Sequence, residues 1–258
     1  MGDEVRSSLA SGVLSLTIHR PEQRNALDRE VLKGLREAIQ QAAGNRGIRV
    51  IALTGAGDKV FCAGADLKSS SSEDEAAGAF SRSDYRALLS EILRCPKPTV
   101  ALARGHVLAG GMGILLACDL ALACDDIHFS TPEINVGMFP MMVLALLYRH
   151  VGRKKAAEML FLGERVPAET ALKLGLINHI YPRAQFDAKA NEFVGKLAEK
   201  SGCILSLGKK AMGHVEDPDL LKDLEYLESA LAQVMSTADG KEGMRAFLEK
   251  RNPVWKDE

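Results

Sequence analysis

Residues 105–139 constrain the fold more strongly than any other part of the chain. The segment reads GHVLAGGMGILLACDLALACDDIHFSTPEINVGMF, and its pattern predicts a turn, a helix, a strand, a turn, a second strand and a loop. Gly110 and Gly111 open the predicted helix, where backbone N–H groups have no intrahelical partner and lie at the positive end of the helix dipole. Glycine lets such a group approach a ligand closely. An oxygen atom that gains negative charge would therefore be stabilised at this helix start.

Glu133 is the candidate proton-transfer group of the same segment. It lies between Pro132 and Ile134, and a carboxylate among apolar neighbours is expected to be partly desolvated. Desolvation raises the pKa of a carboxyl group toward the range that suits proton transfer. Taken singly, a glycine pair usually marks close packing and a lone glutamate is usually a surface residue. A functional interpretation therefore needs support from a second stretch.

Residues 60–68, VFCAGADLK, supply that support. They follow an apolar run at 50–54 that predicts a buried strand, and a glycine-containing turn. Ala65, directly after Gly64, can present a second backbone N–H group. Two N–H groups from separate loops, those of Ala65 and Gly110, could hold one carbonyl oxygen. The polar run at 69–78 is predicted to be a mobile loop beside this site.

The segments VFCAGADLK, GHVLAGGMG, ACDLALA and TPEINVG, in this order and spacing, resemble the crotonase superfamily, also called the enoyl-CoA hydratase/isomerase family. IHRPEQRNAL near the start and AFLEKRNPVWKD near the end fit the same family, so the resemblance covers nearly the whole chain. It implies an α/β fold, with a crotonase-like spiral of ββα units and the acyl-CoA site in residues 1–184. Residues 185–258 would form a helical region for packing and oligomerisation, as a homotrimer or hexamer.

The resemblance also implies the chemistry. An acyl-CoA thioester would be the substrate, and its enolate-like state would be stabilised in an oxyanion hole made by the N–H groups of Ala65 and Gly110. Glu133 would be the acid/base group. No cofactor would be permanently bound and no metal would be required. The further substrate or CoA contacts that the resemblance implies are Arg24, Ala63, Asp66, Leu67, Lys68, Gly113 and Lys250.

One position departs from the pattern of the family's hydratases. They carry a second glutamate three residues after the second oxyanion glycine, where this chain has Gly113. Family isomerases that move a β,γ double bond into conjugation carry only the later glutamate, as here. We therefore expect Glu133 to act alone, in double-bond isomerisation or in hydration and dehydration of an enoyl-CoA. Two alternatives stay open, namely an acyl-CoA decarboxylase or hydrolase of the same fold, and a catalytically weak acyl-CoA-binding protein.

Composition excludes several other classes. An apolar content of 47% over 258 residues supports a full core in one large domain with at most a small appendage, and a net charge of −1 argues against a nucleic-acid partner. The five cysteines have no CxxC spacing, which argues against a disulfide framework or a zinc site. The polar start does not resemble a signal peptide, and no apolar run is long enough to span a membrane. A soluble, cytoplasmic protein without a membrane partner is expected.

Two residues beside the candidate loops have competing interpretations. His106 precedes Gly110 by four residues and could line the pocket, although an ordinary turn histidine is the favoured interpretation. Cys62 could be a nucleophile, but no base is placed by the sequence to activate its thiol. We favour a packing role for Cys62.

Overall fold

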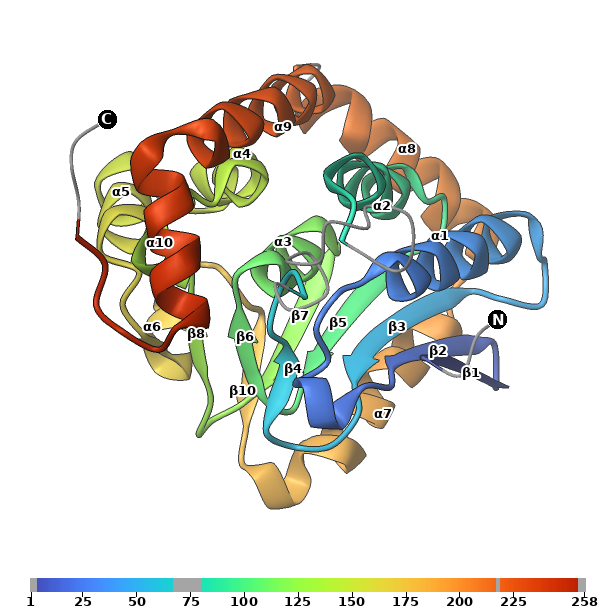
Figure 1. Ribbon diagram of the computed structural model, residues 1–258. Helices are drawn as coiled ribbons and strands as arrows, with labels where there is room; N and C mark the ends of the chain where they lie inside the picture. Colours follow the sequence, from blue (N-terminus) through green and yellow to red (C-terminus); the bar gives the residue numbers. More distant parts are fainter. Residues whose placement is uncertain (1–3, 67–79, 217–218, 255–258) are drawn as a thin grey trace.

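The framework of the molecule is a unit of two strands and a helix that recurs along the chain. A computed structural model describes residues 4–66, 80–216 and 219–254, and every structural statement concerns these residues. From β3 to β8, the first strand of each unit joins a six-stranded sheet, whose full order is β1-β2-β3-β5-β7-β10. The second strand joins a four-stranded sheet in the order β4-β6-β8-β9 (Figure 1). The strands are β1 Val5–Ala10, β2 Val13–Ile18, β3 Val50–Gly55, β4 Val60–Cys62, β5 Thr99–Ala103, β6 His106–Leu108, β7 Leu120–Cys124, β8 His128–Ser130, β9 Val166–Pro167 and β10 His179–Tyr181.

The strands of the larger sheet form where apolar side chains are continuous or alternate. In β2, Leu14, Leu16 and Ile18 are buried and alternate with more accessible residues, whereas β3 is buried almost throughout. Strands β2, β3, β5, β7 and β10 are parallel, and such strands are usually covered on both faces. Strand β1 pairs antiparallel with β2 at the edge, and beyond its first residue its side chains are exposed.

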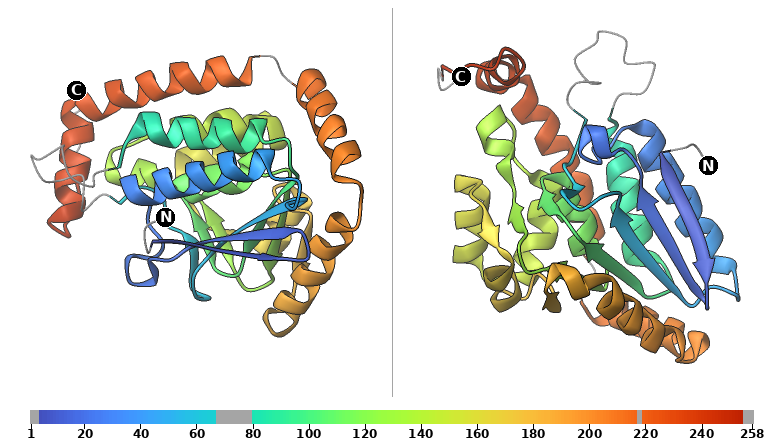
Figure 2. Two further views of the ribbon diagram at one scale, coloured as in Figure 1. Left: turned by 90° about the vertical axis from the view of Figure 1, so that its right-hand side faces the viewer. Right: turned by 90° about the horizontal axis from the view of Figure 1, so that it is seen from below.

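Helices α1 and α2 lie side by side over one face of this sheet, with α3 next to α2 (Figures 1 and 2). Asp28 caps α1 as the sequence predicted, because its carboxylate accepts a hydrogen bond of 2.9 Å from the backbone N–H of Val31. Helix α3 is almost wholly buried between α2, α4 and the smaller sheet. The helices are α1 Arg29–Gly44, α2 Arg82–Arg94, α3 Gly110–Ala117, α4 Met141–His150, α5 Arg153–Leu162, α6 Ala168–Lys173, α7 Phe186–Ala198, α8 Gly202–Glu216, α9 Leu220–Ser236 and α10 Ala238–Leu248; three short 3₁₀ turns are η1 Pro21–Gln23, η3 Pro132–Val136 and η4 Arg183–Gln185.

The carboxy-terminal helices divide into two groups by their packing. Helix α7 packs on the opposite face of the larger sheet, against β2, β3 and β7. Helices α8, α9 and α10 instead follow an arc around the outer margin of the α1 and α2 layer (Figure 2). The mixed α/β architecture and the helical carboxy-terminal region are as predicted. The boundary at residue 184 stays a prediction, and by packing α7 belongs with the sheet.

Two charged side chains of this arc have little exposed surface and are fully engaged in hydrogen bonds. The ammonium group of Lys209 in α8 pairs with the Asp119 carboxylate at 2.6 Å and also donates to the backbone oxygen of Lys97 at 3.1 Å. In α10 the Glu242 carboxylate accepts hydrogen bonds from the Arg251 guanidinium at 2.6 Å and from the Val254 backbone at 3.1 Å. The Lys209 bonds join α8 to the residues just before β5 and β7, and the Glu242 bonds tie the segment after α10 back to that helix. Leu224 and Leu227 of α9 pack into the hydrophobic core. Within the described ranges, no helix combines the length and the apolar character needed to cross a bilayer.

Candidate functional site

Three parallel strands of the smaller sheet end at the same edge, and each is followed by one candidate site residue. Ala65 comes after β4, Gly110 after β6 and Glu133 after β8, and these strands are neighbours in that order. Adjacent strands are separated by about 4.8 Å. The topology therefore brings together three residues of which the first and the last, Ala65 and Glu133, are 68 residues apart in the sequence.

The loops after β4 and β6 touch through glycine. Gly64 has a φ of +83°, and a Cβ atom there would lie 2.7 Å from the Gly110 nitrogen and 2.6 Å from the Ala109 Cβ. Ala109 itself has a positive φ of 49°, which is strained for a residue with a side chain. Only glycine at position 64 permits this approach, because any side chain would push the two loops apart.

The backbone geometry leaves the two candidate N–H groups outside the regular hydrogen-bond pattern. Ala65 forms an isolated parallel bridge with Leu27, through bonds from Leu27 N–H to the Gly64 oxygen at 2.8 Å and from Asp66 N–H to the Leu27 oxygen at 2.9 Å. In such a bridge the central residue points its own N–H away from the partner strand. Gly110 is the first residue of α3, so its N–H has no intrahelical acceptor.

A buried polar network fixes the segment that pairs with Ala65. Asn25 is 1% exposed, and its side-chain amide donates to the backbone oxygens of Ala56 at 3.0 Å and Val60 at 2.7 Å. Its side-chain oxygen accepts a bond of 3.1 Å from the Arg20 backbone. The Arg20 guanidinium forms an ion pair of 3.1 Å with Asp66. The loop that carries Ala65 is therefore held from both sides.

Glu133 lies in the 3₁₀ turn η3, directly after Pro132. Its carboxylate oxygen Oε2 has essentially no accessible surface and no hydrogen-bond partner within the described part of the chain. Burial raises the pKa of this carboxyl group from 4.5 to about 7, and a hydrogen bond from its own backbone offsets part of the effect. Near neutral pH the group is thus divided between its acid and base forms.

Tyr85 is a site residue that the sequence analysis missed. It projects from α2, its hydroxyl donates to the backbone oxygen of Gly110, and it lies next to Gly113. The Glu133 carboxylate contributes to raising the pKa of the Tyr85 phenol, which places the two groups within electrostatic reach. The sequence assigned Tyr85 only to the start of a helix, and its side chain meets α3 solely through tertiary packing.

The remaining predicted contacts are dispersed. Ala63 is half-buried in the loop after β4, and Asp66 is half-buried in its ion pair with Arg20. Arg24 is exposed at the end of η1, and Lys250 is exposed just beyond α10. The predicted contacts Leu67 and Lys68, and the predicted mobile loop at 69–78, lie outside the described residues.

The surroundings of Cys62 and His106 fit roles in packing and hydrogen bonding. Burial raises the pKa of the Cys62 thiol to about 12, so the reactive thiolate is disfavoured at neutral pH. The carbonyl oxygen of Cys62 would lie 2.4 Å from a Cβ atom at Gly111, which explains the second glycine of the pair as close packing. His106 packs against His128 with ring centres 5.4 Å apart, and its Nδ1 accepts a bond of 3.1 Å from the His128 backbone. No group of three or more metal-ligating side chains occurs in the part of the chain that the structure describes.

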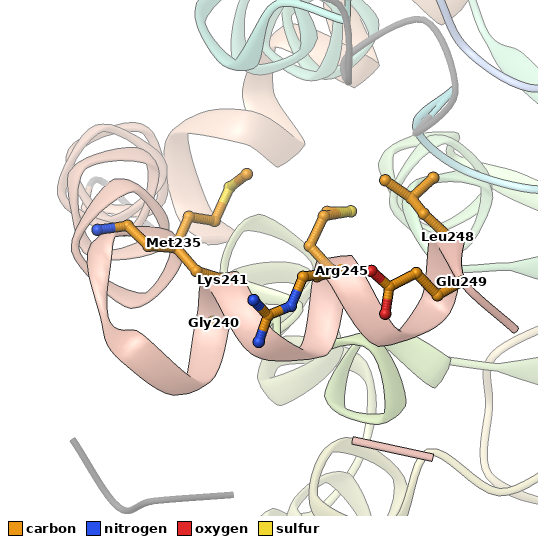
Figure 3. A pocket seen from close by; sticks show the side chains of 7 residues that line it. Met235, Gly240, Lys241, Arg245, Leu248 and Glu249 are labelled. Atoms are coloured by element: carbon orange, nitrogen blue, oxygen red, sulfur yellow. The ribbon is translucent and has the colours of Figure 1, made fainter. Parts of the chain in front are cut away.

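Helix α10 borders both the turn that carries Glu133 and a surface hollow. A Cβ atom at Gly243 would lie 2.5 Å from the Gly137 backbone, so α10 and the loop after η3 are in close contact. On another side of α10 is a pocket of about 420 Å³, shown in Figure 3. It is lined by Met235, Gly240, Lys241, Met244, Arg245, Leu248 and Glu249. Neither Glu133 nor the two candidate N–H groups line it.

Comparisons with known proteins identify the family of the chain and confirm its fold. A family model described as enoyl-CoA hydratase/isomerase matches residues 8–258. The human mitochondrial protein called enoyl-CoA hydratase domain-containing protein 3 is 36% identical over 251 residues, which are 96% of this chain and 82% of that protein. A crystal structure of an enoyl-CoA hydratase/isomerase from Pseudoalteromonas atlantica T6c superposes with a TM-score of 0.89 at 28% identity, covering 98% of this chain and 100% of the other. An enoyl-CoA hydratase from Bacillus anthracis superposes with a TM-score of 0.78 at 30% identity, covering 99% and 100%.

The match therefore extends over the strand ends that carry Ala65, Gly110 and Glu133, and over the carboxy-terminal helices as well. The predicted crotonase fold is confirmed by these structural neighbours. By its sequence and its fold, this chain belongs to the enoyl-CoA hydratase/isomerase family of the crotonase superfamily.

Proposed function

We propose that the protein is an acyl-CoA enzyme that moves the double bond of an enoyl-CoA, with Glu133 as its only acid/base group. The observation that carries this proposal is the buried, unpartnered Oε2 atom of Glu133, together with a carboxyl pKa of about 7. A group with this pKa can accept and return a proton near neutral pH with little free-energy difference between its two forms.

The proposed reaction needs one proton carrier. The Glu133 carboxylate removes a proton from the α-carbon of a β,γ-enoyl thioester, and the electron pair delocalises onto the thioester oxygen. The N–H groups of Ala65 and Gly110 would stabilise that oxygen. Protonated Glu133 then returns the proton to the γ-carbon, which leaves the double bond between the α- and β-carbons. Hydration would also require activation of a water molecule, for which a second carboxylate is absent at Gly113.

Several features support a CoA thioester as the substrate class. Family members act on such thioesters without a metal. Arg24 and Lys250 are exposed cations that could neutralise CoA phosphates. A homotrimer or hexamer and a cytoplasmic location remain proposals that rest on the family resemblance and on the sequence.

The test compares two substrates on the same preparation. A β,γ-enoyl-CoA is followed by the ultraviolet absorbance of the conjugated product, and crotonyl-CoA is followed by the loss of that absorbance on hydration. We expect isomerisation to be the faster reaction. Glu133→Gln should lower it by about 10²–10⁴-fold, because an amide cannot exchange the proton. The exposed Glu169 provides a matched control, since Glu169→Gln should retain full activity.

Other outcomes identify the competing functions. Hydration as fast as isomerisation would contradict the single-acid mechanism. Release of carbon dioxide or of free CoA from an acyl-CoA panel would indicate a decarboxylase or a hydrolase. Binding of acetoacetyl-CoA without turnover of any substrate would indicate an acyl-CoA-binding protein.

A further inference from the structure

Tyr85 lies over the first turn of α3 and is 2% exposed. Its hydroxyl donates a hydrogen bond of 2.7 Å to the backbone oxygen of Gly110. That oxygen belongs to the peptide that follows the candidate N–H group, so the bond fixes the orientation of the helix start. The Tyr85 ring is itself held by Phe80, with ring centres 5.6 Å apart.

The same hydroxyl fills the space beside Gly113. A Cβ atom at position 113 would lie 2.0 Å from the Tyr85 oxygen, 3.2 Å from the ring carbon Cζ and 3.5 Å from Cγ2 of Val143. The hydroxyl oxygen is thus the only one of these atoms at an impossible distance. Gly113 and the Tyr85 hydroxyl are a matched pair, because the hydroxyl leaves no room for a side chain at position 113 and only glycine at position 113 leaves room for the hydroxyl.

The protonation state of Tyr85 argues against a role as the second acid. Burial raises the pKa of the phenol well above 10, and the charges of Cys62 and Glu133 raise it further. The hydroxyl therefore remains neutral under assay conditions, and its single proton is engaged by the Gly110 oxygen. Tyr85 holds a backbone group in place and does not exchange a proton with a substrate.

We propose that Tyr85 is a positioning residue, whose hydroxyl fixes the Gly110 peptide and occupies the space in which a second carboxylate at position 113 would begin. This inference rests on the proposed function for what the site does. The part of the proposal that concerns packing between Tyr85 and Gly113 can be tested without measuring enzyme activity. It also means that Gly113→Glu in the wild-type background, which would otherwise be expected to complete a two-carboxylate pair, should instead disrupt the first turn of α3.

The first experiment measures the melting temperature of wild type, Gly113→Ala, Tyr85→Phe and the double variant. Alanine in a helix normally stabilises relative to glycine, but the clash should make Gly113→Ala lower the Tm by about 3–10 °C. In the Tyr85→Phe background the nearest atom is Cζ at 3.2 Å, so the same substitution should be nearly neutral. An equal effect of Gly113→Ala in both backgrounds would overturn the matched pair. A rise in Tm for Gly113→Ala alone would do so as well, even if Tyr85→Phe failed to fold.

The second experiment tests positioning. A conjugated thioester such as 4-dimethylaminocinnamoyl-CoA absorbs at longer wavelength when its carbonyl oxygen is polarised. We expect Tyr85→Phe to bind this probe with unchanged affinity but a smaller red shift, and to lower kcat by about 5–50-fold with KM changed less than twofold. Tyr148→Phe, which removes the hydroxyl of a residue 41% exposed, is the control. An unchanged red shift in Tyr85→Phe would overturn the positioning role.

The two proposals fail in different ways. Absence of isomerase activity in the wild type would reject the proposed function, while the melting temperatures would still decide whether Tyr85 and Gly113 are matched. Normal isomerase activity in Tyr85→Phe would reject the positioning role and leave the function intact.

Discussion

Glu133→Gln should make the protein more stable at alkaline pH while it removes activity. Folding buries the carboxyl group, and its pKa rises from 4.5 to about 7. Between these values the folded chain binds more protons than the unfolded chain, so the free energy of unfolding falls as the pH rises. Above pH 7 the buried charge costs about 3 kcal/mol relative to a group with an unshifted pKa.

Glutamine does not ionise, so this cost is absent in the variant. For a chain of this length, about 3 kcal/mol corresponds to a rise in Tm of roughly 6–12 °C. The Tm of Glu133→Gln should therefore exceed that of wild type by up to this amount at about pH 8.5, and by little at about pH 5. Because both proteins share every other titrating group, the difference between them at each pH isolates Glu133.

The assay is thermal unfolding across this pH range, together with the pH profile of kcat/KM for isomerisation. Activity of the wild type should rise through about pH 7, because in the proposed reaction the ionised carboxylate would remove the first proton. Glu169→Gln on the exposed face of α6 should change the Tm at neither pH. A difference between Glu133→Gln and wild type that does not depend on pH would refute the buried-charge argument.

Three further substitutions and one measurement of molecular mass test other parts of the structure. Gly64→Ala should lower activity more than 100-fold and lower the Tm, because the new Cβ would lie 2.6 Å from the Ala109 Cβ. Gly57→Ala is the control. Gly57 also has a positive φ but has open space around it, so this variant should show only the cost of the backbone strain. Asn25→Ala should cost about 2–4 kcal/mol in urea unfolding, because three hydrogen bonds of a buried side chain are lost. Lys209→Met should cost about 1–3 kcal/mol by the same assay, because Asp119 loses its cation. Light scattering should give at least about three times the chain mass of 27.9 kDa, and a monomer at micromolar concentration would contradict the predicted trimer or hexamer.

The parts of the fold that could be predicted are those in which local pattern and burial agree. Apolar alternation in β2 and the continuous apolar run in β3 indicated strands, and Asp28 indicated the start of α1. Strand β1 was missed because only Val5 is buried, and its pairing with β2 at the sheet edge leaves no apolar alternation to recognise. Strand β6 has only three residues, too few to show a period.

The candidate site divides in the same way. Gly110 and Glu133 were predicted because a glycine at a helix start and a glutamate among apolar residues carry a local chemical signal, which the family resemblance supports; their roles stay predictions. Tyr85 carries none, since its role depends on the contact between α2 and α3. The position of α7 on the sheet was likewise not evident, because an amphipathic helix shows which face is apolar and not which surface covers that face.

The order of strands in the smaller sheet has a consequence for how such a protein can change its chemistry. Each of three successive strand–strand–helix units carries one candidate site residue, after β4, β6 and β8. If these residues act as proposed, a substitution after one strand would change the reaction while the residues after the other two strands still contact the substrate. Gly113 and Tyr85 illustrate this independence, because they sit on the helices that follow β6 and β4 and leave the turn after β8 untouched. The two sheets form a common scaffold, so a new reaction would require substitutions after only one strand and no change in the strands themselves.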